Sequence, residues 1–379
     1  MVCTACALAF AAGSAASRAT AEPPPALRIV EAVLPNWLEQ RPHAAAKSGV
    51  DVTPSEAVKA AFRNALELAL ADEWTAAAAA ATDAGYEWIA VVDDGLWYPA
   101  LIERDGAGVG PTVVLNPSAR RDLIAEAPHS SSEAFTGTEV GWLLQRAGAR
   151  AVVAEGADRC ATAELSGCDG ETFACDEASA PYRASDVAHS ANTLFETAHE
   201  VLAIAFPAAT VVQMHGMRAD PTWLVASDGS GEDRASDSGL AARVRDRVRA
   251  DLGAPVYAVS CQDAADHAFP YRNLCASSNV QGRWLGGSED ACTLEAPQPS
   301  GRFLHLEQTL ELTNMSPPGR PVLEAIAAEL PLLDGAGPDT EGPLGRKPLP
   351  EAFGRDVSSE PPPPIRGCAV GLGPRRGRR

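Results

Sequence analysis

The sequence predicts an α/β fold, in which a mostly parallel mixed sheet lies between two helical layers as an α/β/α sandwich. The prediction rests on the alternation of two patterns. From Val113 onward, short runs of β-branched and other apolar residues alternate with stretches whose apolar residues recur every three or four positions. Strands that alternate with helices in this way form sheets covered by helices on both faces. The chain before Val113 has a different pattern, which predicts a small N-terminal α+β region.

The first 21 residues have the features of an export signal. Ala5 to Ala16 is a run of small, mostly apolar residues, and Ala19-Thr20-Ala21 fits the A-x-A cleavage rule, although the usual basic segment is missing. The sequence therefore predicts a secreted or periplasmic protein. No other run reaches the ~18 apolar residues that a membrane helix needs, so no membrane span is expected.

Residues 22–112 are expected to form an N-terminal accessory region that contains a helix and a hairpin. Thr53-Pro54-Ser55-Glu56 has the pattern of a helix start with Thr53 as the N-cap, and apolar residues then recur at every fourth position from Val58 to Leu70. Two strand-like runs follow, and the turn signal Asp93-Asp94-Gly95 between them predicts a hairpin. These runs cover residues 86–92 and 96–103.

Residues 113–335 are expected to form the main α/β domain. Its predicted strands are 123–127, 151–154, 210–214, 223–226, 256–259 and 303–306, and its predicted helices have apolar faces over 140–147, 187–202, 240–248 and 322–333. Gly148 and Gly253 are expected to end two of these helices. Residues 336–379 are rich in proline and glycine, including Pro361–Pro364, and predict a disordered tail that cannot build a core.

Composition and charge narrow the possible functions. With 46% hydrophobic and 21% charged residues, the chain of 379 residues has the composition of a globular protein. A formal net charge of −19 argues against nucleic-acid binding, because such surfaces need clustered Lys and Arg to neutralise phosphates. A small-molecule or peptide substrate is the expected partner, and the oligomeric state stays open.

The cysteines predict disulfide bonds. Outside the export signal and the tail there is no C-x-x-C pair, so the spacing favours disulfides over a thiolate metal site. The sequence alone does not give the pairing. The six cysteines concerned are Cys160, Cys168, Cys175, Cys261, Cys275 and Cys292.

Three short segments place a histidine or a carboxylate at the end of a strand-like run, where an α/β sheet presents side chains to a ligand. They contain His129 and Glu133, then His215, then Glu307. Two imidazoles and a carboxylate make an open zinc site, and a second carboxylate beside it can act as a base. We therefore expect His129, Glu133 and His215 to bind Zn²⁺ if the segments converge. The alternative places these residues in exposed loops and Glu307 on an edge strand.

Arg159 follows the predicted strand 151–154, and a guanidinium at a strand end is suited to bidentate capture of a substrate carboxylate. Its alternative is a salt bridge to Asp158 or Glu155. The sequence contains no G-x-S-x-G nucleophile elbow, which argues against a serine hydrolase of that type. It also contains no G-x-G-x-x-G or Walker motif, which argues against a nucleotide cofactor.

The order of His129–Glu133, His215 and Glu307 resembles the zinc carboxypeptidase-like superfamily in its broad sense, which includes poly-γ-glutamate hydrolases and N-formylglutamate amidohydrolases. The resemblance covers roughly residues 115–330. It implies His129, Glu133 and His215 as zinc ligands, Glu307 as catalytic base and Arg159 as a substrate anchor. The spacing H-x-x-x-E departs from the H-x-x-E of carboxypeptidases, so Glu139 is the alternative third ligand.

Taken together, these features predict an exported zinc-dependent hydrolase of amide bonds, with residues 113–335 as its catalytic domain. The bonds that fit are peptidyl, γ-glutamyl or N-acyl amino-acid bonds. The second hypothesis is a secreted, disulfide-stabilised binding protein of the same fold without catalytic activity.

Overall fold

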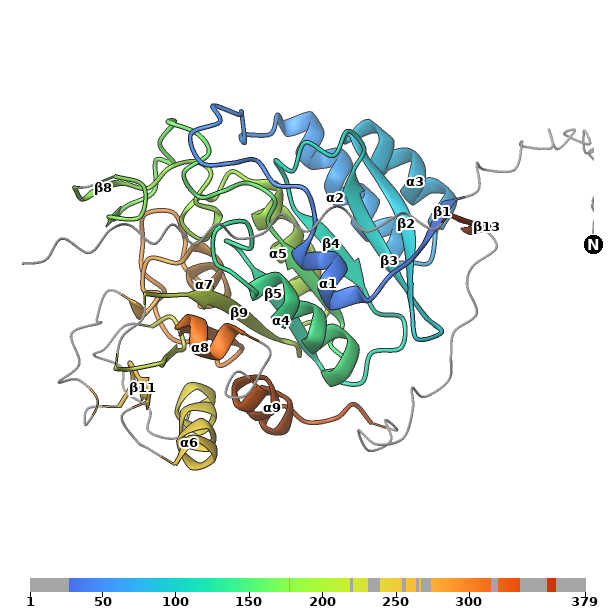
Figure 1. The fold of residues 1–379 in the computed structure, drawn as a ribbon. Helices are drawn as coiled ribbons and strands as arrows, with labels where there is room; N and C mark the ends of the chain where they lie inside the picture. Colours follow the sequence, from blue (N-terminus) through green and yellow to red (C-terminus); the bar gives the residue numbers. More distant parts are fainter. Residues whose placement is uncertain are drawn as a thin grey trace, which may run out of the picture.

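The computed structural model describes residues 27–176, 178–218, 221–230, 239–253, 257–263, 266, 274–314, 320–334 and 353–358 (Figure 1). The export signal predicted for residues 1–21 and most of the predicted tail lie outside these ranges. The described chain alternates strands and helices, as the sequence predicts.

One large sheet organises the molecule. Its strands are β1 (Leu27–Glu31), β2 (Tyr86–Asp93), β3 (Leu96–Glu103), β4 (Thr112–Leu115), β5 (Leu123–Ala127), β6 (Ala151–Ala154), β9 (Thr210–Gly216), β10 (Leu224–Ser227), β11 (Ala258–Ser260), β12 (Phe303–Gln308) and β13 (Phe353–Ser358). The strand order is β11-β10-β12-β9-β5-β6-β4-β3-β2-β1-β13. A separate short ribbon pairs β7 (Glu171–Thr172) with β8 (Ala180–Pro181).

The centre of the sheet is parallel and its flanks are mixed. Strands β12, β9, β5 and β6 are adjacent and parallel, whereas β10, β4 and β3 each run antiparallel to a neighbour. From β5 the chain passes to β6 on one side and then returns to β9 on the other side. This reversal makes the carboxyl end of β5 a topological switch point, which is where open α/β sheets bind ligands.

Helices cover both faces of the sheet, which confirms the predicted α/β/α sandwich (Figure 1). One face packs against α1 (Leu34–Glu39), α4 (Thr136–Trp142) with its π-helical extension Leu143–Ala147, α6 (Leu240–Leu252) and α9 (Arg320–Glu329). The other face packs against α2 (Glu56–Leu70), α3 (Trp74–Asp83) and α5 (Leu194–Ala205). Short helices complete the described chain: a 3₁₀ turn at Val187–His189, α7 (Val280–Leu285) and α8 (Leu310–Thr313).

The central strands are buried on both faces, and successive side chains enter opposite cores. In β5, Leu123 and Ala125 belong to the core under α4, whereas Ile124 belongs to the core under α5. In β9 the neighbours Val211 and Val212 divide in the same way. This explains why these strands appear in the sequence as continuous apolar runs without polar alternation.

Two helices begin at other residues than the sequence predicts, because side-chain hydrogen bonds cap their first turns. Ser55, not Thr53, caps α2, since its hydroxyl accepts a hydrogen bond from the Val58 N–H at 3.3 Å. The single long helix predicted over 187–202 is interrupted, and α5 starts only after Thr193, whose hydroxyl accepts from the Glu196 N–H. Gly148 and Gly253 end their helices with φ of 72°, as predicted.

The N-terminal region shares the sheet of the main domain. The predicted hairpin is present, with β2 and β3 antiparallel from Tyr86↔Glu103 to Asp93↔Leu96, but β3 continues onto β4, which pairs with β6. The tail prediction is wrong for residues 353–358, which form β13 and pair in parallel with β1. Ladder hydrogen bonds use backbone groups alone, so a sequence without an apolar pattern can still extend an open edge.

Disulfides tie the loops around the sheet together, as predicted. The pairs are Cys160–Cys175, Cys168–Cys292 and Cys261–Cys275. Cys168–Cys292 joins segments separated by 124 positions, so it restricts the unfolded chain more than the other two bonds. Among the described residues, no helix has the length and apolar character that crossing a membrane requires.

Arg121 connects the end of α9 to the start of β5 through hydrogen bonds. It lies just before β5 and is buried, and it donates to the carbonyls of Ala147, Ala327 and Leu330 at 2.7, 2.9 and 3.2 Å. We expect Arg121→Met to lower the free energy of unfolding by roughly 2–4 kcal/mol, because it leaves buried helix-end carbonyls unpaired. Urea denaturation measures this. Arg104→Met, at an exposed position, is the matched control and should change stability by less than ~0.5 kcal/mol; an equal loss in both variants would contradict the assignment.

Candidate metal centre

The predicted site residues follow adjacent parallel strands at the centre of the sheet. His129 and Glu133 lie in the turn after β5, His215 lies near the end of β9, and Glu307 lies near the end of β12. Arg159 comes from the loop after β6, the fourth strand of this group. The parallel register places Glu307 directly opposite His215. Convergence therefore follows from strand order, because parallel strands present their carboxyl ends at one edge.

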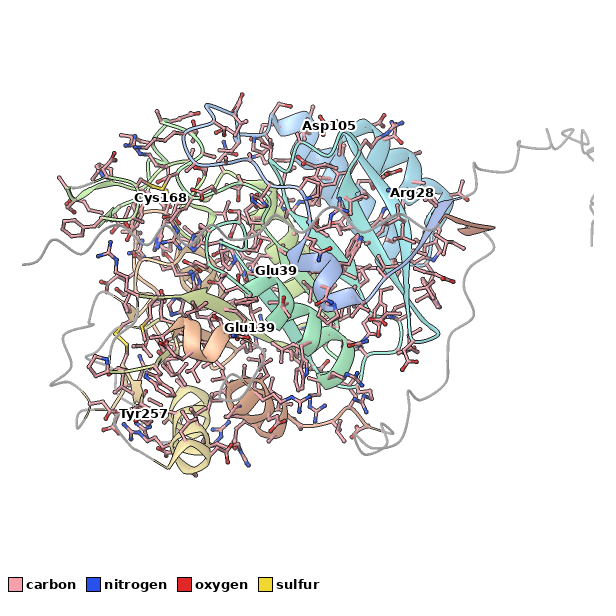
Figure 2. The ribbon with its side chains drawn as sticks, in the orientation of Figure 1. Arg28, Glu39, Asp105, Glu139, Cys168 and Tyr257 are labelled. Carbon is pink, nitrogen blue, oxygen red and sulfur yellow. A yellow bond between two sulfur atoms is a disulfide. The ribbon has the colours of Figure 1, made fainter. Side chains whose placement is uncertain are left out.

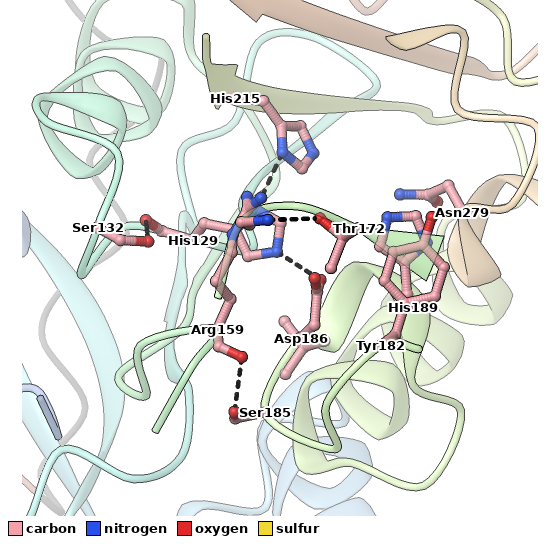
Figure 3. A network of polar contacts seen from close by, with 12 residues as sticks. His129, Ser132, Arg159, Thr172, Tyr182, Ser185, Asp186, His189, His215 and Asn279 are labelled. Atoms are coloured by element: carbon pink, nitrogen blue, oxygen red, sulfur yellow. Dashed lines mark hydrogen bonds and ion pairs between the residues drawn. The ribbon is translucent and has the colours of Figure 1, made fainter. Parts of the chain in front are cut away.

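Three side chains form a compact donor group. The Nδ1 atoms of His129 and His215 lie 3.2 Å apart, and Glu133 Oε1 lies 3.1 Å from His129 Nδ1. Glu133 Oε2 lies 3.5 Å from His215 Nδ1 and accepts a hydrogen bond from the Gly216 N–H at 2.9 Å. All three side chains are buried. Figure 3 shows the His129 and His215 rings facing the same small space, with Arg159 between them.

Asp186 fixes the tautomer of His129. Its Oδ1 lies 2.9 Å from His129 Nε2 (Figure 3). Burial by itself raises the pKa of Asp186, but the positive charges of His129, His189 and Arg159 hold it well below its usual range. The carboxylate is therefore an acceptor, and His129 Nε2 must donate to it. In a neutral ring this leaves the lone pair on Nδ1, which faces the donor group.

A buried network of side-chain amides fixes the tautomer of His215. Gln213 Nε2 donates to Glu126 Oε2 at 2.8 Å and to Gln281 Oε1 at 3.0 Å, so the amide cannot be flipped. Gln213 Oε1 then accepts from Asn279 Nδ2 at 2.7 Å and lies 3.4 Å from His215 Nε2. With Nε2 as the donor, the Nδ1 lone pair of a neutral His215 also faces the donor group.

Arg159 supplies positive charge at the same point. Its guanidinium contacts both Glu133 Oε1 and His129 Nδ1. Burial alone raises the pKa of Glu133, but the charges of Arg159 and His129 more than offset this, and the pKa lies well below the usual range. For His215 burial dominates and lowers the pKa, which keeps the ring neutral near pH 7. Glu133 is thus ionised and His215 neutral, which are the states that metal binding requires of these two residues.

Glu307 and His305 form the neighbouring wall. His305 Nε2 lies 3.6 Å from Glu307 Oε1, and the rings of His305 and His215 are 4.5 Å apart. Burial, followed by the negative charge of Glu133, raises the pKa of Glu307 to about 8. A small cavity of about 40 Å³ lies between these residues. Its lining includes His129, Arg159, His189, His215, Asn279 and Glu307.

The donor atoms fit a metal ion. Two imidazole nitrogens and one carboxylate oxygen lie within 4.8 Å of one another, and His215, His305 and Glu307 form a second group that meets the same criterion. The Asp186 contact adds the carboxylate–histidine pairing that orients metal-binding imidazoles. His129, Glu133 and His215 can therefore hold a metal ion.

The sequence located the donor group but missed its support. Glu139, the alternative third ligand, lies away from the group: its Oε2 accepts from Gln308 Nε2 at 3.1 Å, and burial holds its pKa well above the usual range. Figure 2 shows it on α4 near Glu39. The spacing of Asp186 and His189 in the sequence allows both to line the site, but the pairing of Asp186 with His129 and the role of Gln213 have no sequence signal. Each depends on which side chain the fold brings beside it.

Metal binding tests this geometry. We expect the purified protein to bind one equivalent of zinc per chain through the first donor group, and His215→Ala to abolish this. Asp186→Asn should weaken the affinity by roughly 10- to 100-fold, because the amide no longer holds the His129 tautomer. Isothermal titration with ZnCl₂ measures both. His43→Ala removes an exposed histidine and should bind as the parent does; the same loss in this control would contradict the site.

Comparison of the chain with protein-family models, with curated proteins and with solved structures gives no match. The relation to zinc carboxypeptidase-like proteins thus stays a prediction from short motifs. The donor set, its hydrogen-bond partners and its place at the switch point of the sheet are the basis for interpreting this site.

Proposed function

We propose that this protein is an exported zinc-dependent hydrolase of amide bonds. The observation that carries the proposal is the position of Glu307. It places a carboxylate that is 13% exposed beside a donor group of two imidazoles and one carboxylate, opposite His215 in the strand register. A carboxylate next to an open metal site is the arrangement that hydrolysis of an unreactive carbonyl needs.

Zinc is the metal that the ligands favour. Buried imidazoles together with a single carboxylate suit zinc better than calcium or magnesium, which prefer sets of oxygen ligands. Three protein ligands leave a further coordination position open, which distinguishes a catalytic site from a structural one. When bound there, zinc would supply Lewis acidity toward a water molecule and a carbonyl group.

The residues of the chain then have separate roles. Glu307 accepts the proton of the attacking water and later delivers it to the leaving amine, for which a pKa raised by burial is suitable. Arg159 turns from Glu133 toward the substrate and stabilises negative charge on the carbonyl oxygen or holds a substrate carboxylate. Asp186 and Gln213 keep the two imidazoles oriented throughout.

The surroundings suit a small acyl or peptide substrate outside the cytoplasm. The cavity is small and its walls are mainly polar, with Arg159, His189 and Asn279 available to hydrogen-bond a carbonyl or carboxylate. Peptidyl, γ-glutamyl and N-acyl amino-acid bonds all provide such groups. Disulfide bonds beside the site, at Cys160 and Cys275, support an oxidising compartment.

A binding protein without activity is the second candidate. The contacts of Arg159 with Glu133 and His129 satisfy these side chains without a metal, and such a network suits a protein that only binds. Zinc stoichiometry separates the two, because only the hydrolase requires the ion.

Glu307→Gln should lower kcat/KM by a factor of roughly 10²–10⁴ while zinc stays bound, because the amide cannot accept the proton. Hydrolysis of γ-glutamyl and N-acyl amino-acid substrates, measured beside zinc content, checks this. Glu311→Gln, at an exposed position close by, is the matched control. Full activity in Glu307→Gln would remove this residue from the mechanism.

Arg159→Met should separate substrate binding from metal binding. We expect kcat/KM to fall by roughly 10²–10³, because the charge that stabilises the carbonyl oxygen is gone. Zinc affinity should stay the same or increase, since Arg159 is no ligand and its positive charge contacts the ligand atoms. Zinc titration and steady-state kinetics check both effects. Loss of zinc in Arg159→Met, with Arg104→Met unchanged, would contradict this division of roles.

A further inference from the structure

A second and larger cavity lies away from the metal centre. It has a volume of about 330 Å³ and shares no lining residue with the cavity at Glu307. Its walls come from the segment that leads into α2, from the end of β3 and the loop that follows it, and from the residues after β6. Figure 2 marks Asp105, one of its lining residues. Pockets for small ligands start at about this size.

The charged residues of this cavity are all acidic. Asp51, Glu103, Asp105 and Glu155 line it, and no lysine, arginine or histidine does so among the described residues. Glu155 is buried, and its Oε1 accepts from the N–H groups of Gly156 and Ala157 at 2.9 and 3.0 Å. Burial raises the pKa of Glu155 to about 8. A buried carboxylate without a cation is costly, so the cavity favours a positively charged occupant.

The Tyr86 hydroxyl is an independent sign of a ligand. Tyr86 is 2% exposed and lines the cavity, and its hydroxyl has no hydrogen-bond partner among the described residues. The hydroxyl lies against Gly110, where a Cβ atom would come within 2.1 Å of it. A Cβ atom at Gly110 would also lie within 3.5 Å of Glu103 Oε1, so the hydroxyl is next to an acidic residue of the cavity. An unpaired buried hydroxyl is unfavourable, and a bound donor or acceptor would remove that cost.

The remaining walls are apolar. Val52, Pro54, Val58, Val109 and Leu194 line the cavity beside the carboxylates. A ligand that matches both parts has a cationic head and an aliphatic stem. We propose that this cavity binds an alkylammonium group, either of a free amine or of a lysine side chain, with Glu155, Glu103 and the Tyr86 hydroxyl around the ammonium.

A bare metal ion fits this cavity less well. The groups of His, Cys, Asp and Glu that approach metal-binding geometry in the described chain are the two at the metal centre, and neither contains Glu103 or Glu155. Among the described residues no three carboxylates of the cavity therefore come together around one ion, and the apolar walls offer it no ligands. An ammonium group has three N–H donors and bonds to separated acceptors.

Calorimetric titration of the oxidised full chain tests the proposal with matched probes. Cadaverine represents a free amine, Nα-acetyl-lysine N-methylamide represents a lysine side chain, and Nα-acetyl-norleucine N-methylamide has the same stem length without the charge. Saturable binding of either cationic probe, with no binding of the norleucine compound, supports the site, and the tighter probe identifies the source. Absence of binding by both cations, or equal binding of norleucine, overturns it.

Variants locate the binding and keep it separate from the hydrolase proposal. Glu155→Gln keeps an acceptor for the Gly156 and Ala157 N–H groups but removes the charge, so the affinity should fall about tenfold or more. Glu67→Gln, exposed on α2, makes the same change outside the cavity and should leave the affinity unaltered. His215→Ala should also bind the cation normally. Unchanged affinity in Glu155→Gln would refute the site.

Tyr86→Phe gives a readout that folding alone does not explain. Removing an unpartnered buried hydroxyl should leave the Tm unchanged or raise it, whereas the affinity for the cationic probe should fall severalfold. A lower Tm with unaltered affinity would show that the hydroxyl serves the fold, and would overturn its role in binding.

Discussion

Charge compensation at the buried ends of β5 and β9 is the constraint on which the site depends. Glu133 and Asp186 are both buried and both ionised, and buried carboxylates persist only beside positive charge or a metal. In the protein by itself Arg159 supplies that charge to Glu133, and His129 donates a hydrogen bond to Asp186. A metal ion would take over this function from Arg159. The same electrostatic requirement thus explains both the arginine contact and the capacity to bind metal.

The position of Arg159 in turn depends on the loop after β6. Cys160 follows it directly and is bonded to Cys175, while the carbonyl of Arg159 accepts from the Ser185 hydroxyl at 2.8 Å. Asp186 is the next residue, so one short segment carries the partner of His129 and the hydroxyl that holds the Arg159 backbone. Loops without regular structure can place charged side chains accurately when covalent and hydrogen bonds restrict them in this way.

The acidic cavity and the candidate metal centre are connected through the residues that follow β5 and β6. Glu155 lines the former, and its carbonyl accepts from Ser130, the neighbour of His129. One sheet edge therefore carries both the Arg159–Glu133 ion pair of the candidate metal centre and the Glu155 carboxylate of the acidic cavity.

The sandwich, most strand positions and the donor group of His129, Glu133 and His215 could be predicted from local patterns in the sequence. Apolar runs and helical periodicity are local properties, and strand ends are predictable from them. Only the tertiary structure decided that β5, β6, β9 and β12 are adjacent, that β13 extends the far edge, and that Asp186 faces His129. Such contacts join residues that are distant in the chain, and no local pattern encodes which of several acids reaches a given imidazole. The packing of the folded chain decides which acid lies beside which imidazole.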